Sequence, residues 1–231
     1  MAWLKGPEIG GYIEIAKNVH FRGAMVHQNP LVFTYYNDFF NYVAADWTVT
    51  EIGAGGTEAL TAAAGGQLLI TTDALDNDGV QIQIPAATFY PAAGKDIWFE
   101  TRIQLVTAAK QAESELLVGL AGIDATILAA PADGIYFTKA DADALISATT
   151  NVGSAVTSTP GVATLVAATW YRLGFHVKSN TVVEFFVDGV LKATHTAGIT
   201  AVGLTPTFAV LNGEAGATAW KIDYFMVSQE R

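Results

Sequence analysis

The sequence contains no cysteine among its 231 residues. Disulfide bonds, thiolate metal sites and cysteine nucleophiles are therefore excluded. A chain that needs no disulfide is compatible with folding in a reducing cytoplasm. We accordingly expect a protein that is made in the cytoplasm of its host cell.

Charge is also scarce, because Asp, Glu, Lys and Arg make up only 15% of the chain, against roughly 25% in an average soluble domain. The formal net charge is −10, and the 12 basic residues are scattered. Nucleic-acid binding requires clustered Lys and Arg, so we expect no nucleic-acid partner. Two explanations of this neutral surface stand equally. Part of it is buried in an oligomer or an assembly, or the chain is simply a β protein rich in Ala, Thr and Gly.

Long apolar runs and clear helices are missing too. No stretch reaches 18 uninterrupted apolar residues, so we expect no transmembrane helix. The first residues, MAWLKGPEIGGYIEIAK, have no continuous apolar core and contain an early Gly-Pro, so we expect no signal peptide. The best helical candidate, TAAKQAESE at 107–115, has no apolar stripe and is predicted to form a loop or a single turn.

Short strand-like runs fill the rest of the chain from about residue 38. In Gln81-Ile82-Gln83-Ile84, for example, the glutamines point one way and the isoleucines the other. Such alternation indicates antiparallel strands with one apolar face, and a dozen of them predict a two-sheet sandwich. The predicted strands are 47–52, 67–71, 80–84, 97–106, 116–120, 135–138, 144–149, 170–177, 182–187, 191–196, 207–211 and 220–227.

Residues 170–196 read WYRLGFHVKSNTVVEFFVDGVLKATHT, and the Asp-Gly pair at 188–189 is a hairpin turn signal. We therefore predict a three-strand meander whose apolar residues share one face. Those residues are Leu173, Phe175, Val177, Val183, Phe185 and Val187.

This stretch resembles the late strands of laminin-G-like and concanavalin A-like jelly rolls. GKDIWFETRIQL at 94–105 is similar to the middle strand of that family, and LTPTFAVLNGEAGATAWKIDYFMVSQE at 204–230 is similar to its closing pair. The closing pair also resembles sandwich domains of bacteriophage virion proteins, including capsid decoration proteins. The resemblance covers residues 38–231 and implies an all-β, two-sheet antiparallel jelly-roll sandwich of the concanavalin A-like type.

Residues 1–37 have no counterpart in that fold, and we interpret them as an extended N-terminal arm. Gly6-Pro7, Gly10-Gly11 and Asn29-Pro30 interrupt the arm, yet it is too rich in aromatic and aliphatic residues for a disordered tail. It is expected to be buried either by its own domain or, as we favour, by neighbouring subunits. The predicted contact residues are Trp3, Tyr12, Ile13, Ile15, Val19 and Phe21.

No catalytic residue is expected. Glycoside hydrolases of the jelly-roll superfamily place paired acidic residues on one strand of the concave face, as Glu-x-Asp-x-Glu or Glu-x-Asp-x-x-Glu. Here Glu100 is the only acidic residue of its strand, and Glu113 and Glu115 fall in an expected loop. We therefore predict a protein that is not an enzyme.

Metal and cofactor signals are equally weak. Asp73, Asp76 and Asp78 are weak candidates for a calcium site, but the EF-hand spacing and its distal Glu are missing, so we interpret them as a polar turn. His176 and His195 can be neighbours across the meander, but no nucleophile completes a triad, and His176 is expected to be partly exposed. No metal and no cofactor are predicted.

Two functions follow from the arm, the sandwich and the resemblance. The first is a structural virion protein, a phage capsid decoration (cement) protein on the outer capsid surface. Its arm would bind the major capsid protein or neighbouring virion subunits, and it would form a homo-oligomer such as a trimer. The alternative is a carbohydrate-binding module or adhesin with a surface glycan as its partner, with Trp47, Trp98, Trp170 and Trp220 as candidate contacts.

Overall fold

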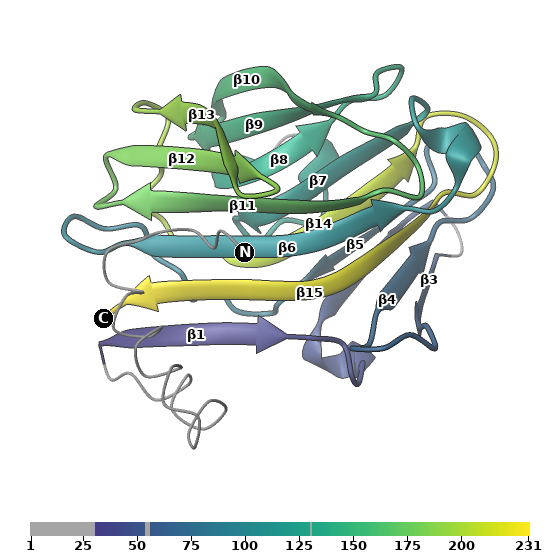
Figure 1. The fold of residues 1–231 in the computed structure, drawn as a ribbon, viewed down its shortest axis with the longest axis horizontal. Helices are drawn as coiled ribbons and strands as arrows, with labels where there is room; N and C mark the ends of the chain where they lie inside the picture. Colours follow the sequence, from purple (N-terminus) through teal and green to yellow (C-terminus); the bar gives the residue numbers. More distant parts are fainter. Residues whose placement is uncertain (1–30, 54–55, 130) are drawn as a thin grey trace.

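The computed structural model describes residues 31–53, 56–129 and 131–231. Within them, two antiparallel sheets pack face to face (Figure 1). Sheet A contains β1 (Val32–Asn37), β3 (Thr57–Leu60), β4 (Leu68–Thr71), β6 (Ile97–Leu105), β11 (Trp170–Lys178), β12 (Val182–Val187), β13 (Val190–His195) and β15 (Ala219–Glu230). Sheet B contains β2 (Thr48–Ile52), β5 (Gly79–Gln83), β7 (Ser114–Ala121), β8 (Gly134–Lys139), β9 (Leu145–Val152), β10 (Ala155–Thr164) and β14 (Thr205–Asn212).

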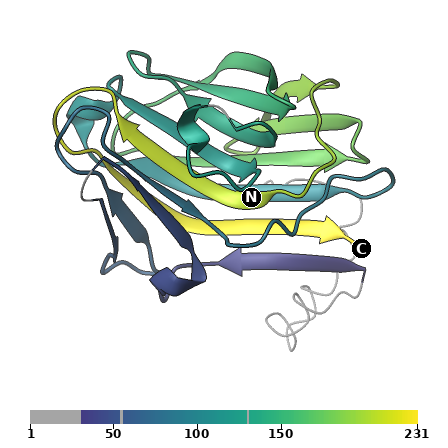
Figure 2. The ribbon, with the colours of Figure 1, turned by 180° about the vertical axis from the view of Figure 1, so that it is seen from behind.

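The strand order shows how distant parts of the chain are brought together. Sheet A runs β13-β12-β11-β6-β15-β4-β3, with β1 beside β15, and sheet B runs β10-β9-β8-β7-β14-β5-β2. Figure 2 shows the molecule from the side of sheet B. Three single turns of 3-10 helix complete the described elements: η1 (Ala44–Asp46), η2 (Ala108–Lys110) and η3 (Ile127–Ala129). The predicted all-β, two-sheet antiparallel sandwich is confirmed.

The core follows from the alternation of apolar side chains along the strands. In the meander β11-β12-β13, Phe175 and Phe185 are fully buried, and their rings lie 5.8 Å apart between the sheets. All six apolar residues predicted to share one face of the meander are buried. Across the sandwich, Phe185 contacts Phe137 of sheet B in an edge-to-face arrangement at 5.3 Å. Burial of these aromatic rings is the main favourable contribution to folding.

Three strands were not predicted from the sequence: β1, β3 and β10. Strand β10 contains Pro160 and Gly161, and its pairing with β9 shifts register between Thr159 and Ala163. Proline within a strand is typical of edges and bulges, and β10 lies at the edge of sheet B. The two breakers therefore mark an irregular edge strand.

Strand β1 lies in the segment that the sequence analysis assigned to the N-terminal arm. Its residues pair with β15 from Val32 opposite Glu230 to Asn37 opposite Phe225. Phe33 stacks on Phe89 with ring centres 5.5 Å apart, and Tyr35 packs edge-on against Trp47 at 6.4 Å. Residues 32–37 are thus part of the sandwich, because their aromatic side chains complete its core. The contact residues predicted between Trp3 and Phe21 lie outside the described residues.

In the described part of the chain, we find no helix with the length and hydropathy needed to cross a bilayer.

Candidate functional site

The outer face of sheet B is crossed by residues 122–129 and 131–133, which lie between β7 and β8 in the chain and are called the crossing segment below. The segment includes η3, and its Leu128 packs against Leu117, Ala121, Tyr136 and Ala209 of the sheet. These residues form a small apolar cluster that is separate from the main core. The crossing segment therefore covers the middle of this face.

Side-chain amides of β5 hold one end of the crossing segment. Gln83 donates from Nε2 to the carbonyl of Gly122 at 3.0 Å and accepts from the N–H of Asp124 at 3.3 Å. Gln81 donates to the carbonyl of Asp124. Both glutamines are essentially buried, with 0% and 1% exposure. The alternation predicted for β5 is thus present, but its polar face is covered rather than solvated.

A third amide, that of Asn151 on β9, holds the other end of the segment. Its Nδ2 donates to the carbonyl of Pro131, and the residue is 0% exposed. Its Oδ1 is buried and has no hydrogen-bond partner among the described residues. Because an unsatisfied buried carbonyl costs free energy, Asn151 is an unusual residue on this face.

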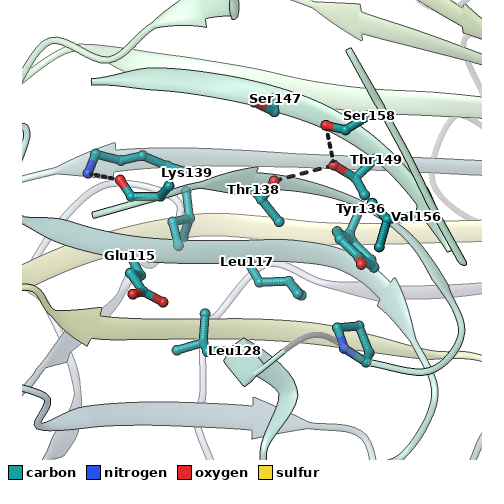
Figure 3. Close-up of a pocket in the computed structure, with 13 residues that line it drawn as sticks. Glu115, Leu117, Leu128, Tyr136, Thr138, Lys139, Ser147, Thr149, Val156 and Ser158 are labelled. Carbon is teal, nitrogen blue, oxygen red and sulfur yellow. Dashed lines mark hydrogen bonds between the residues drawn. The ribbon is translucent and has the colours of Figure 1, made fainter. Parts of the chain in front are cut away.

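On one side of the crossing segment lies a depression of about 310 Å³ (Figure 3). Its floor carries a row of hydroxyl groups on three adjacent strands. Thr138 Oγ1 lies 3.3 Å from Thr149 Oγ1, which lies 3.1 Å from Ser158 Oγ. Ser147 and the apolar Val156 lie beside the row. The depression thus offers hydrogen-bonding groups without net charge next to apolar surface.

A second depression, of about 340 Å³, lies on the other side of the crossing segment. It is lined by Ile52, Glu115, Ala125, Thr126, Leu128, Ala129 and Leu211. Glu115 and Leu128 line both depressions. The two hollows are therefore separated by the crossing segment and meet at these two side chains.

Glu115 is the only carboxylate among the described residues that line the two depressions. It is the second residue of β7 rather than part of the loop predicted from the sequence, because β7 begins already at Ser114. Burial, followed by the negative charge of Asp141, raises the pKa of Glu115 above its usual range. A retaining or inverting glycosidase requires two carboxyl groups on opposite sides of the scissile bond, and the described lining of the two depressions supplies one.

Lys139 also borders the first depression, and its ammonium group donates all three of its hydrogen bonds to main-chain carbonyls. It donates to the carbonyls of Ala112 at 2.7 Å and Ala140 at 3.0 Å, and also to that of Ser114. The side chain is 2% exposed, and its burial lowers the pKa to about 8. Lys139 joins the strand ends of β7 and β8 and has no free N–H for a ligand.

Glu100, the other acidic residue considered in the sequence, lies on sheet A. It accepts a hydrogen bond from the Tyr224 hydroxyl at 2.5 Å and lies 3.9 Å from Arg172. Burial raises its pKa. Glu100 and Glu115 therefore stand on different sheets and do not form a catalytic pair.

The three aspartates that were weak calcium candidates form a turn with their own backbone. Asp73 Oδ1 accepts from the N–H of Ala74 at 2.8 Å, and Asp78 Oδ2 accepts from that of Leu75 at 3.2 Å. Asp76 lies exposed at the tip of this turn. Among the described residues, no group of three or more acidic, His or Cys side chains is placed to hold a metal ion.

The two histidines of the meander lie on opposite faces of sheet A, so the idea that they are neighbours is wrong. His176 pairs with Glu184 across β11 and β12, whereas His195 pairs with Val183 and faces the core. The prediction that His176 is partly exposed is also wrong, because the side chain is buried with 5% exposure.

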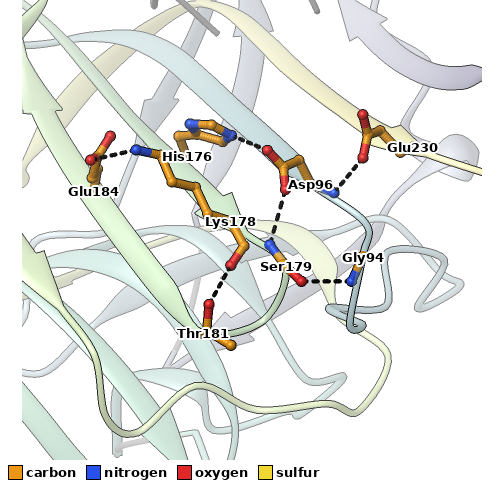
Figure 4. A network of polar contacts seen from close by, with 8 residues as sticks. All are labelled: Gly94, Asp96, His176, Lys178, Ser179, Thr181, Glu184 and Glu230. Carbon is orange, nitrogen blue, oxygen red and sulfur yellow. Dashed lines mark hydrogen bonds and ion pairs between the residues drawn. The ribbon is translucent and has the colours of Figure 1, made fainter. Parts of the chain in front are cut away.

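His176 belongs to a polar network at one end of sheet A (Figure 4). Its Nε2 lies 2.7 Å from Asp96 Oδ2, and the ring stacks on Trp98 at 5.0 Å. Asp96 Oδ1 accepts from the N–H of Ser179 at 2.9 Å. The Ser179 hydroxyl accepts from the N–H of Gly94, so this serine fixes a turn rather than facing the histidine.

The tryptophans proposed as glycan contacts are mostly buried. Trp47 and Trp220 belong to the core, and Trp98 is only 2% exposed. Trp170 is half-buried, and the Arg102 guanidinium lies over its ring at 4.5 Å. The hydroxyl row and the amides of sheet B were not recognised in the sequence as a site, because Thr, Ser and Gln in strands carry no distinctive spacing.

A comparison with protein families matches residues 66–223 to the family described as SO2946-like, C-terminal domain. A search of curated proteins found no relative of this sequence.

Solved structures share the fold at low identity. Protein SO2946 of Shewanella oneidensis MR-1, described as a protein of unknown function, is 14% identical with a TM-score of 0.62, covering 100% of this chain and 96% of its own. The endo-1,3-beta-glucanase of Streptomyces sioyaensis is 16% identical with a TM-score of 0.65, covering 87% of this chain and 98% of its own. A Bacillus licheniformis beta-glucanase is 12% identical with a TM-score of 0.60, covering 84% of this chain and 97% of its own. These likenesses confirm the concanavalin A-like jelly roll.

Proposed function

The chain belongs to the SO2946-like, C-terminal domain family, and we propose that its sandwich is a non-catalytic carbohydrate-binding module whose ligand lies on the outer face of sheet B. The observation that carries this proposal is the hydroxyl row Thr138–Thr149–Ser158 in the open depression beside the crossing segment. Jelly-roll neighbours that act on glucans make a saccharide the natural ligand class for such a face.

The chemistry of the depression favours a neutral sugar. Hydroxyl groups both donate and accept, as sugar hydroxyls do, so Thr138, Ser147 and Ser158 can exchange hydrogen bonds with a glycan without a charge partner. Val156, which is 55% exposed, supplies apolar surface for the C–H face of a pyranose ring. The one carboxylate, Glu115, adds an acceptor for a pair of sugar hydroxyls.

Binding without turnover is favoured by the same residues. Hydrolysis requires a second carboxyl group, and a lyase requires a free base and a group that neutralises the uronate. Lys139 is saturated by three carbonyls, and Tyr136 is 2% exposed beneath the crossing segment. Neither side chain is available for these tasks.

The test is a glycan-array screen followed by calorimetry with the best neutral glycan. The double variant Thr138→Val, Ser158→Ala removes two hydroxyls at nearly constant volume, and we expect at least a tenfold loss of affinity. Thr194→Val, at an exposed position of β13, serves as the matched control and should bind like the wild type. Unchanged affinity of the double variant, or turnover of the glycan, would contradict the proposal.

A second candidate is the virion decoration role, and a different observation supports it. Residues 1–30, which include Trp3, Tyr12 and Phe21, precede β1 in the sequence, and β1 is joined to sheet A through its pairing with β15. A leading segment that is continuous in sequence with a strand of the sandwich suits a protein that binds a shell through that segment, while alternate side chains supply specificity. The resemblance of residues 204–230 to virion sandwich domains points the same way.

This role is tested by deleting residues 1–30 while β1 is kept, so that the sandwich is preserved. We expect the truncated protein to lose binding to purified phage shells in co-sedimentation, while the full chain binds. Shell binding that survives the deletion would leave the arm without this function.

A further inference from the structure

We infer that the crossing segment is a built-in competitor: it occupies the central part of the glycan face, and a neutral saccharide chain binds with full affinity only when the segment is displaced. This inference rests on the proposed function, since it describes the regulation of that same face.

The first argument is the chemistry beneath the segment. An outer sheet face that only needs to be covered would be covered most simply by apolar contacts, yet here Gln81, Gln83 and Asn151 are buried. These amides bond to main-chain groups of the crossing segment. An amide that binds a peptide C=O or N–H also binds a sugar hydroxyl, which donates and accepts in the same way.

The second argument is an unsatisfied acceptor under the segment. Asn151 Oδ1 is buried and has no hydrogen-bond partner among the described residues, although the residue is 0% exposed. The closed arrangement therefore leaves part of the hydrogen-bonding capacity of this face unused. A ligand that brings a hydroxyl donor to Asn151 would satisfy it.

The third argument is the way in which the segment is attached. Its ends meet where the N–H of Gly122 donates to the carbonyl of Asp133 at 3.0 Å, directly after the β7–β8 pair Ala121 and Gly134. Between these ends, Leu128 packs against the sheet, and the side chains of Gln81, Gln83 and Asn151 and the N–H of Ser154 bond to main-chain groups of the segment. None of these contacts belongs to the β7–β8 pairing, so exchanging them for contacts with a ligand leaves that pairing unchanged.

The position of the two depressions indicates an extended ligand. Both hollows are bordered by Leu128 and Glu115, one hollow on each side of the segment. Removal of Leu128 from the face joins them into one groove across β9, β8, β7 and β14. A groove of this length suits several linked sugar units, whereas either hollow alone suits one or two.

Competition has a quantitative consequence. If the face is free only in a fraction of molecules, the apparent dissociation constant is the intrinsic one divided by that fraction. Releasing the segment should therefore tighten binding, whereas loss of a true contact should weaken it. An increase in glycan affinity on release of the crossing segment identifies the segment as a competitor of the glycan, and a decrease identifies it as part of the binding site.

The experiment uses the full chain and a soluble β-1,3-glucan as the probe, with affinity measured by calorimetry. In the first variant, an Asn-Gly turn replaces residues 123–132, because Ala121 and Gly134 already form a hairpin pair that a two-residue turn can close. In the second variant, Leu128→Ala removes the apolar contact of the segment and leaves every residue of the sheet unchanged. Leu75→Ala, at an exposed leucine outside this face, is the matched control.

We expect both variants to bind the glucan about tenfold more tightly than the wild type, and the control to be unchanged. Equal affinity of wild type and variants, or weaker binding by the variants, would overturn the inference while leaving the proposed function intact. Failure of both the wild type and the variants to bind the glucan, or any neutral glycan on the array, would remove the proposed function itself. If the protein with the shortened loop does not fold, the affinity of the Leu128→Ala variant tests the inference by itself.

Discussion

At the scale of single residues, His195 links the two sheets at the side where β13 lies near β10. Its Nδ1 lies 3.1 Å from the Thr150 hydroxyl, and its Nε2 lies 2.9 Å from the Thr159 hydroxyl. The ring is 4% exposed and packs 5.1 Å from Phe185. Burial lowers the pKa of His195 below its usual value of 6.5.

This shift predicts acid sensitivity. At a pH between the folded and the unfolded pKa, the unfolded chain binds the proton more readily, so stability is complete above about 6.5 and falls as the pH drops through the folded pKa. We expect urea-induced unfolding to show lower stability at pH 5 than at pH 7.5, with a smaller difference in His195→Gln. The difference should persist in the control Thr194→Val. A pH dependence that is the same in His195→Gln would refute the assignment.

The direction of side chains was predictable, but their surroundings were not. Alternation places the Gln81 and Gln83 side chains on the face opposite the core, and the structure agrees. They bond to Gly122 and Asp124, about 40 positions later in the chain, which no local pattern connects to β5. His176 was misjudged for the same reason, since its partner Asp96 is 80 residues away.

At the scale of elements, β1 is a strand that contributes to the core, although it precedes the region of family resemblance. Phe33 and Tyr35 pack against the main core, and the strand pairs along six residues with β15. This role was not predicted from the sequence, because residues 32–37 directly follow a segment that Gly and Pro residues interrupt and were assigned to the same arm.

Two truncations isolate the contribution of β1. Deleting residues 1–37 removes the contacts of two partly buried rings, Phe33 and Tyr35, together with the β1–β15 pairing, and loss of a single fully buried ring typically costs about 3–5 kcal/mol. Relative to deletion of residues 1–30, we therefore expect the longer deletion to lower the free energy of unfolding by at least about 3 kcal/mol in urea titrations. Equal stability of the two truncated proteins would show that β1 is dispensable.

The strands that were predicted and those that were missed differ in their local chemistry. β11 and β12 were recognisable because β-branched and aromatic residues alternate up to an Asp-Gly turn, in which Asp188 and Gly189 both adopt positive φ. β10 was missed because Pro160 and Gly161 interrupt it. An edge strand tolerates such residues, since one side of its backbone needs no partner.

At the scale of the whole molecule, the amino-acid composition and patterning predict the fold but not the candidate site. A chain with 51% apolar residues and little charge forms a two-layer core, as patterning predicts. The candidate face could not be predicted, because it is assembled from β5, β7, β8, β9 and β10 by sheet pairing alone. Its Thr, Ser and Gln residues are common in strands and become a site only through their neighbours.

The hydrogen bond between Gly122 and Asp133 has a consequence for how this architecture can vary. Since the two ends of the β7–β8 connection meet at a paired strand end, the connection can change in length and composition without altering the strand pairing of the sandwich. Exchange of the β7–β8 loop alone can therefore give the same sandwich a new binding specificity.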